Sequence, residues 1–218
     1  MPKYENAIFD LDGTLLDTKD GIIKSLSFMS SNLKLPPIPE CKNNLFIGPP
    51  IEQSVREYYG LDDQKTTEAA AMFRKVYAES YLFEAVLYDG ILNTLSSLKN
   101  NGIRLAIATY KRHDYAKKII EHFGLNEFCN PCLGSDSACR NTKTAIILAC
   151  IMEMNADVSR TVYIGDTEHD RVGAKETNID FIGVTYGFGY IKGNCSKDFA
   201  NTPAEIAEII LGGACNVT

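Results

Sequence analysis

The stretch FDLDGTL, residues 9–15, follows a short apolar run at the point where a strand should end and a loop begin. In extended backbone, residues two apart point to the same face, so Asp10 and Asp12 can address one substrate. Gly13 lets the chain turn sharply, and Thr14 adds a hydroxyl. Two carboxylates this close repel each other unless a cation or a shared proton intervenes. The stretch therefore indicates a divalent metal, a nucleophilic carboxylate and a second acid for proton transfer, with a solvated turn as the plain alternative.

The composition limits the class of protein. At 218 residues the chain suits one large domain or two small ones, and it can bury a core. A net charge of -6 argues against a nucleic-acid partner, because phosphates demand a basic surface. No apolar run approaches the roughly 20 residues that span a bilayer, and the start MPKYENAIFD has no hydrophobic segment of signal-peptide length. We therefore expect a cytoplasmic protein without a membrane partner.

The seven cysteines are expected to be free and often buried, because the cytosol is reducing. Cys129 and Cys132 form a C-x-x-C pair, which could be redox-active or half of a zinc site. No second C-x-x-C and no well-spaced histidine pair completes a metal set. Packing is therefore the main expectation for this pair.

Apolar runs of strand length alternate with runs of helical length, which is the pattern of a parallel sheet covered on both faces. The expected strands are residues 7–9, 103–109, 161–164 and 181–184, with a weaker edge strand at 129–133 that contains a proline. The expected helices are residues 113–123, 144–154, 170–177 and 203–211. The run 144–154 is nearly all apolar, so we expect it to be buried. The predicted fold class is α/β.

Residues 17–86 interrupt this alternation. They carry few strand signals and predict helices at 19–33, 51–59 and 63–82, separated by proline-rich segments at 36–39 and 48–50. A helical insert after the first strand indicates a separate domain. We therefore expect a helical cap domain at 17–86 and an α/β core formed by 1–16 and 87–218.

Further polar residues follow the predicted strands. Thr109 ends the clearest strand, and open parallel sheets bind ligands at the carboxyl ends of their strands. Its hydroxyl can donate to a phosphate oxygen, with Lys111 as an extra cation. Lys143 stands at the start of the apolar helix, where an anion would offset the unfavourable interaction of a cation with the helix dipole. The plain alternatives are a threonine that ends a strand and solvated lysines.

The segment GDTEHD, residues 165–170, follows another predicted strand. Asp166 and Asp170 lie four residues apart after the strand end, which suits a hard cation bound by oxygen atoms. The other polar residues near these motifs are interpreted as exposed or capping residues: Glu168, His169, His113 and His122.

The order and spacing of these residues resemble the four motifs of the haloacid dehalogenase superfamily over almost the whole chain. The matching positions are DLDGT at 10–14, Thr109, Lys143 and GDTEHD at 165–170. Residues 17–86 look like the C1-type cap of that superfamily. The nearest resemblance is to its phosphoglycolate phosphatase-like enzymes, in particular a 5'-nucleotidase-like branch, and it is carried by residues 46–61, 121–125, 134–143 and 183–189. Tyr110, Arg112 and Thr167 depart from the pattern, which leaves the carboxylates intact and the substrate open.

The resemblance implies a phosphatase with a Rossmann-like three-layer core around a parallel sheet. Asp10 would attack phosphorus and form an aspartyl-phosphate, because a positioned carboxylate is a usable nucleophile. Asp12 would protonate the leaving oxygen and then take a proton from the hydrolytic water. The phosphate-binding residues that the resemblance implies are Thr109 and Lys143.

The resemblance also implies Mg2+ as the cofactor. The ion would be held by an Asp10 oxygen, the backbone carbonyl of Asp12 and Asp166. Asp170 would lie outside these ligands and orient a bound water or Lys143.

Selectivity for the leaving group should come from whatever covers the core. Gly48, which is followed by two prolines, Arg56 and Lys111 are the candidate substrate contacts. The expected partner is a small phosphorylated metabolite. A sugar phosphomutase and a regulatory phosphate-binding module stay as alternatives, whereas a dehalogenase is disfavoured because it needs neither Asp12 nor a metal. The physiological substrate and the oligomeric state stay open.

Overall fold

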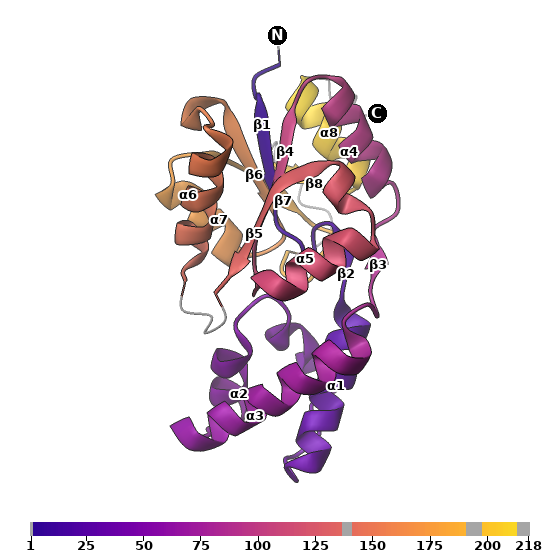
Figure 1. The fold of residues 1–218 in the computed structure, drawn as a ribbon, viewed down its shortest axis with the longest axis vertical. Coiled ribbons are helices and arrows are strands. Elements are labelled where there is room, and N and C mark those ends of the chain that lie inside the picture. The colour runs from indigo at the N-terminus through magenta and orange to yellow at the C-terminus, as the bar shows by residue number, and fades with distance from the viewer. Residues whose placement is uncertain (1, 137–140, 191–197, 213–218) are drawn as a thin grey trace. The chain divides into compact units, whose positions relative to one another are not determined.

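The computed structural model describes residues 2–136, 141–190 and 198–212. The chain folds into two compact units, Met1–Leu16 with Leu87–Thr218 and Asp17–Val86 (Figure 1). A two-stranded sheet, β2 (Leu16–Asp17) with β3 (Val86–Leu87), lies where the chain passes from one unit to the other.

The larger unit is built on a six-stranded sheet with the order β5-β4-β1-β6-β7-β8. Its strands are β1 (Asn6–Phe9), β4 (Arg104–Arg112), β5 (Cys129–Ser135), β6 (Thr161–Gly165), β7 (Asp180–Val184) and β8 (Phe199–Ala200). Every neighbouring pair in this sheet is parallel. All residues of β1 and β6 are buried, as expected for central strands of a parallel sheet covered on both faces. The predicted α/β fold is confirmed, and β5 with its proline lies at the sheet edge.

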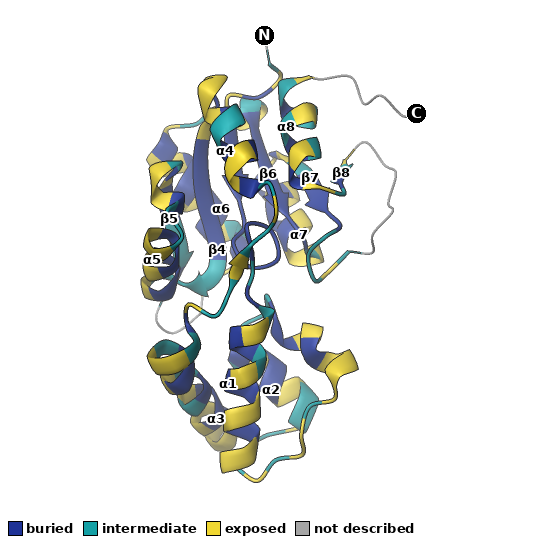
Figure 2. Ribbon diagram, turned by 90° about the vertical axis from the view of Figure 1, so that its right-hand side faces the viewer, coloured by how far each residue is buried: buried dark blue, intermediate teal, exposed yellow. Residues whose placement is uncertain are grey.

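Helices cover both faces of this sheet. They are α4 (Ile91–Asn100), α5 (His113–His122), α6 (Lys143–Met154), α7 (Glu168–Glu176) and α8 (Pro203–Leu211), with 3-10 turns at Leu125–Glu127 and Val158–Arg160. α6 packs with α7, and α4 packs with α8 (Figure 1). Figure 2 shows buried strands between helices whose outward faces are exposed. No helix within the described ranges is long and apolar enough to cross a membrane.

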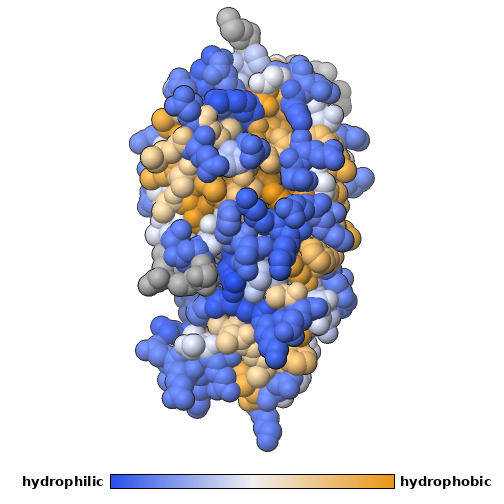
Figure 3. Space-filling view, in the orientation of Figure 1, coloured by the Kyte–Doolittle hydropathy of each residue, from blue (hydrophilic) through white to orange (hydrophobic). Residues whose placement is uncertain are grey.

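The helix expected at 144–154 is not buried all round. Leu148 is 44% exposed and Met152 is 78% exposed, so the outward face of α6 is apolar and solvated. Figure 3 shows apolar residues among hydrophilic ones on the face that it draws. The expectation of a fully buried helix was wrong because overall hydrophobicity does not fix how many faces find a partner.

The smaller unit, residues 17–86, is helical. It contains α1 (Lys19–Asn32), α2 (Ile51–Tyr59), α3 (Asp63–Val76), a 3-10 helix at Glu40–Phe46 and a π-helix at Tyr77–Tyr81. α3 packs against both α1 and α2. Asp62 begins α3, since its carboxylate accepts from the backbone N–H of Lys65 at 2.8 Å. The expected single helix at 63–82 instead changes to π-helix after Val76.

The C-x-x-C pair lies in the sheet. Cys129 and Cys132 are buried in β5 as free thiols. Burial raises the pKa of both thiols, that of Cys132 to about 12. A redox-active cysteine needs the opposite shift, so the described geometry favours packing. Three further cysteines lie outside the described residues: Cys139, Cys195 and Cys215.

Candidate active site

Three neighbouring parallel strands bring polar residues of the expected site to the same edge of the sheet: two of these residues directly follow their strands, and Thr109 lies in the last part of β4. β1 lies between β4 and β6, and Asp10 directly follows β1 while Asp166 directly follows β6. The backbone N–H of Asp10 donates to the carbonyl of Ile164 at 2.8 Å, which ties the first loop to β6. The carboxyl edge of a parallel sheet is where α/β folds bind ligands.

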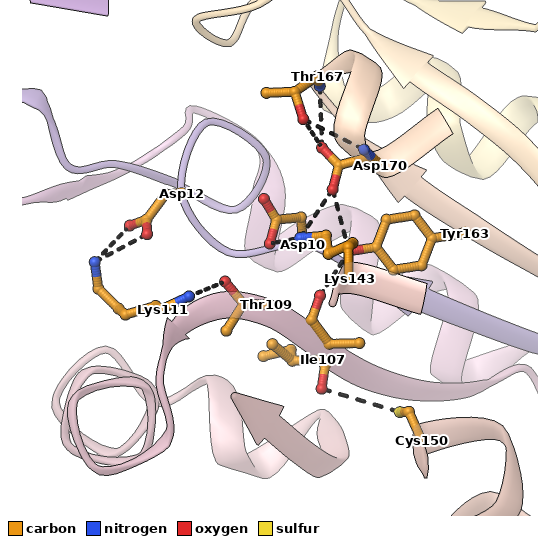
Figure 4. A network of polar contacts seen from close by, with 11 residues as sticks. Asp10, Asp12, Ile107, Thr109, Lys111, Lys143, Cys150, Tyr163, Thr167 and Asp170 are labelled. Atoms are coloured by element: carbon orange, nitrogen blue, oxygen red, sulfur yellow. Dashed lines mark hydrogen bonds and ion pairs between the residues drawn. The ribbon is translucent and has the colours of Figure 1, made fainter. Parts of the chain in front are cut away.

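Lys143 joins two of the carboxylates (Figure 4). Its Nζ atom lies 2.8 Å from Oδ1 of Asp10 and 2.8 Å from Oδ1 of Asp170. All three side chains are buried. Burial acts to lower the pKa of Lys143, but the carboxylates of Asp10 and Asp170 raise it by more, so the ammonium stays charged. A buried cation is thereby held beside the carboxylate that the sequence identifies as the nucleophile.

Two tyrosine rings flank the same ammonium. Its Nζ atom lies 5.4 Å from the ring centre of Tyr110 and 5.6 Å from that of Tyr163, within the range of cation–π attraction. The Tyr163 hydroxyl donates to the carbonyl of Ala108 and contacts Asp170 at 3.4 Å. Tyr110 is one of the departures from the superfamily pattern, and its place beside Lys143 could not be read from the sequence.

Asp170 is oriented by the first turn of α7. Its Oδ2 atom accepts from the backbone N–H of Thr167 at 3.0 Å and from the Thr167 hydroxyl at 2.7 Å. The backbone N–H of Asp170 donates in turn to the Thr167 hydroxyl oxygen at 3.4 Å, which completes a capping box. Its Oδ1 atom is taken by Lys143 and Tyr163. Because both oxygens already have protein partners, the geometry favours Asp170 as the residue that positions Lys143.

Asp166 is the carboxylate best placed to receive a metal. Its Oδ2 atom accepts from the backbone N–H of Phe188 at 2.8 Å, whereas its buried Oδ1 atom has no hydrogen-bond partner among the described residues. Burial, and then the charges of Asp170 and Asp10, raise the pKa of Asp166 well above the ordinary value of an aspartate. Oxygens of these three carboxylates lie within 4.8 Å of one another. Within this cluster, the oxygens of Asp10 and Asp166 fit a hard divalent cation.

Glycines line the Asp166 carboxylate. A Cβ atom at Gly13 or at Gly187 would collide with its side chain. Gly13 also has a φ of 83°, in the left-handed region that glycine reaches without strain. The glycines of the first motif and of the 183–189 segment therefore let two loops close around one carboxylate.

Asp12 forms a second ion pair beside the first. The Nζ atom of Lys111 lies 2.9 Å from each Asp12 oxygen, and both side chains are nearly buried. The backbone N–H of Lys111 donates to the Thr109 hydroxyl at 3.2 Å. Figure 4 shows this pair next to the Asp10–Lys143 group. Asp12 and Thr109, which the sequence assigns to the site, thus both contact Lys111.

An irregularity in β4 places Lys111. The expected strand end at Thr109 was wrong, since β4 continues to Arg112. Its register against β5 shifts between Thr109 and Arg112, so two residues leave the regular pairing. Such bulges re-aim side chains near active sites, and they leave no clear signal in a single sequence.

The other expected residues lie elsewhere. Gly48 and Arg56 belong to the smaller unit, where Arg56 pairs with Asp63 at 2.6 Å. Their role as substrate contacts stays a prediction. The remaining polar residues are on helices of the larger unit, and all but the half-buried His113 are exposed: Glu168, His169, His113 and His122.

Comparison with known proteins identifies the class. The model of the haloacid dehalogenase-like hydrolase family matches residues 7–184, so the chain belongs to this family. It is 33% identical over 188 residues to a 5'-nucleotidase of Pseudomonas aeruginosa, covering 86% of this chain and 85% of that one. It is 27% identical over 191 residues to phosphoglycolate phosphatase 1 of the same organism, covering 84% and 70%. A solved structure of a predicted phosphatase from Clostridium acetobutylicum superimposes with a TM-score of 0.88 at 35% identity, covering 96% and 99%. Within the family, the chain is an enzyme of the phosphatase type.

Proposed function

We propose that the chain is a Mg2+-dependent phosphomonoesterase that hydrolyses a small phosphorylated metabolite through an aspartyl-phosphate on Asp10. The observation that carries this proposal is the pairing of Asp10 with Lys143 next to the unpartnered oxygen of Asp166. The three groups that the proposal needs, the Asp10 carboxylate, the Lys143 ammonium and the Asp166 carboxylate, lie at one edge of the sheet, which supports it.

Asp10 and Asp12 perform the two chemical steps. An Asp10 oxygen forms a bond to phosphorus as the bond to the leaving oxygen breaks, and Asp12 gives that oxygen a proton. Asp12 then takes a proton from water as the water oxygen attacks phosphorus and the bond to Asp10 breaks. Inorganic phosphate leaves and the Asp10 carboxylate is restored.

Lys143 and Thr109 bind the transferring phosphoryl group. The Lys143 ammonium is fixed before substrate arrives, by Asp170 on one side and two tyrosine rings on others. Preorganised charge of this kind stabilises a transition state without the cost of reorganisation. The Thr109 hydroxyl, which is buried at the same edge of the sheet, would donate a hydrogen bond to the phosphoryl group.

The residues that would hold Mg2+ are Asp10, the Asp12 carbonyl and Asp166. When bound, the ion would offset the charge of the carboxylates and of the phosphoryl group. With every carboxyl group ionised, the described side chains of the site would carry an excess of negative charge, with four carboxylates against two ammonium groups: Asp10, Asp12, Asp166 and Asp170 against Lys111 and Lys143. A phosphate ester carries further negative charge, and the ion would also reduce that repulsion.

Hydrolysis of a generic ester tests this proposal. Purified protein should release phosphate from para-nitrophenyl phosphate with Mg2+ and lose that activity in excess EDTA. Asp10→Asn keeps the shape of the side chain but removes the nucleophile, so turnover should fall by several orders of magnitude while the circular dichroism spectrum stays unchanged. Beryllium fluoride, a mimic of the acyl phosphate, should bind at Asp10. Near-normal turnover by folded Asp10→Asn protein would contradict the covalent mechanism.

The alternatives predict other products. A sugar phosphomutase would return a phosphorylated isomer instead of inorganic phosphate, and a regulatory phosphate-binding module would release none. A panel of phosphoglycolate, nucleoside 5'-monophosphates and sugar phosphates, analysed for products with and without Mg2+, separates these cases.

A further inference from the structure

The mechanism proposed above gives Lys111 no step, yet its ammonium contacts Asp12, the proposed proton donor. It lies 2.9 Å from both oxygens of Asp12, and the two side chains are only 6% and 9% exposed (Figure 4). A charge pair this far removed from water is costly to separate unless another charged group replaces the lost partner. Asp12, the proposed proton donor, is therefore ion-paired with the Lys111 ammonium through both of its carboxylate oxygens.

The position of Lys111 relative to the substrate follows from the role of Asp12. Asp12 must reach the ester oxygen with a hydrogen bond of about 2.7 Å, and each of its oxygens is 2.9 Å from the Lys111 Nζ atom. The ammonium therefore lies within roughly 6 Å of the ester oxygen. Lys143 already occupies the phosphoryl side, beside Asp10. Lys111 is thus a cation on the side of the leaving group.

One oxygen of Asp12 must turn from Lys111 to the ester oxygen when the substrate binds. With a neutral leaving group, the ammonium loses half of its contact with Asp12, and the leaving group brings no negative charge to replace it. With a leaving group that carries its own anion near the ester oxygen, that anion takes the vacated place. The exchange favours anionic leaving groups by the energy of a hydrogen bond to a charged group.

We propose that Lys111 is a specificity-determining residue that binds a second anionic group, such as a carboxylate, carried by the leaving group next to the scissile ester. This inference rests on the proposed phosphatase function and narrows its substrate class. A phosphorylated 2-hydroxy acid has such a group. The 5'-oxygen of a nucleoside monophosphate belongs to a neutral sugar and has none.

A matched pair of substrates tests this selectivity. 2-Phosphoglycolate and its amide, 2-phosphoglycolamide, have nearly the same shape, but only the acid carries the second charge. The wild-type protein should prefer the acid by about 10- to 100-fold in kcat/KM, the range of a hydrogen bond to a charged group. In Lys111→Met this ratio should fall close to one, and Lys111→Arg, which keeps the charge, should retain most of it. Lys118→Met, the same change at an exposed lysine of α5, should leave the ratio unchanged.

The ratio separates substrate binding from mere positioning of Asp12. If Lys111 only positions Asp12, both substrates lose rate by the same factor and the ratio stays, which would overturn the inference. A wild-type ratio near one would overturn it as well. Binding to the slow variant Asp10→Asn, measured by calorimetry, should show the same preference for the acid, and Asp10→Asn/Lys111→Met should lose it.

Failure of the proposed function looks different. In that case the wild-type protein releases no phosphate from either compound or from para-nitrophenyl phosphate with Mg2+. The calorimetric comparison still decides whether Lys111 discriminates the acid from the amide, because it needs no turnover. Equal binding of the two compounds by Asp10→Asn would overturn the inference in that case too.

Discussion

At the residue scale, the described part of the site holds more buried carboxyl groups than lysines. Burial and neighbouring carboxylates raise the pKa of Asp10 and of Asp166, with Lys143 opposing the shift at both. A carboxyl group whose pKa is raised in this way destabilises the folded protein when it is ionised at neutral pH. In the proposed mechanism this charge is used, by Asp10 for attack on phosphorus and by Asp166 for binding a cation.

Replacing Asp166 should separate metal binding from folding. The Asp166 carboxyl group binds a proton more tightly in the folded state. At pH values above its ordinary pKa of 3.8, the folded state therefore holds more protons than the unfolded state. The free energy of unfolding therefore falls as pH rises through this window. Asp166→Asn should remove that loss, so in EDTA the variant should keep more of its stability between pH 5 and pH 7.5 than the wild type does. Thermal unfolding at the two pH values measures this.

The same variant should no longer respond to Mg2+. At a concentration 100 times its Kd, the ion should stabilise the wild-type protein by about 2.7 kcal/mol at neutral pH. This gain should be small in Asp166→Asn and should shrink in the wild type at pH 5, because protons compete with the ion for the carboxylates. An equal Mg2+ response in both proteins would mean that the ion binds elsewhere.

At the element scale, we expect the first turn of α7 to affect both the stability of the protein and the proposed catalysis. Thr167 closes the capping box, and its hydroxyl and backbone N–H fix the carboxylate that in turn positions Lys143. Thr167→Val keeps the shape but removes the hydroxyl, so unfolding should become easier by about 1 kcal/mol. The rate should also fall by a few-fold, because Asp170 loses one of the two donors that orient it. Chemical denaturation and kcat measure the two effects.

Thr202→Val is the matched control for this prediction. Thr202 caps α8 in the same way, by accepting from the backbone N–H of Glu205, but Glu205 contacts neither lysine of the site in the described structure. We expect the same loss of stability and an unchanged kcat. If both variants lost rate equally, the effect at Thr167 would come from general destabilisation.

Many of the helices and strands could be predicted from the sequence, because burial gives the apolar residues of each element a regular spacing. Runs such as TVYIG and DFIGV are strands because both faces of the sheet are covered. α4 was not predicted, although Ile91, Leu95 and Leu98 are spaced for one helix face and are buried. β8 has two residues, too few to show any period.

The chemical groups of the candidate site could be predicted, but their pairing could not. Asp10, Asp12 and Asp166 stand in short motifs whose local spacing suggests their chemistry. The two ion pairs join residues 133 and 99 positions apart, Lys143 with Asp10 and Lys111 with Asp12. Only the strand order and the bulge in β4 bring them together.

At the scale of the whole molecule, we expect the two units to contribute differently to the proposed function. The carboxylates and lysines of the site all lie in the larger unit. Residues 17–86 form a unit with its own buried side chains, among them Leu26, Met29 and Phe73. If Lys111 determines selectivity for the charge of the leaving group, we expect the smaller unit to determine selectivity for its size and shape.

Within the smaller unit, we expect the segment 48–50 to contribute to selectivity for the size and shape of the leaving group. Gly48 has a φ of 104°, a conformation that disfavours other residues, and two prolines restrict the chain after it. Pro49→Ala loosens the segment without straining Gly48, so it should change the order of preference among phosphoglycolate, sugar phosphates and nucleoside 5'-monophosphates. It should leave the Mg2+ concentration for half-maximal rate unchanged, since no carboxylate is touched. Pro37→Ala, at an exposed proline of the same unit, should change neither. A uniform loss across the panel with an unchanged order would mean that the segment supports the fold and that selectivity for size lies elsewhere.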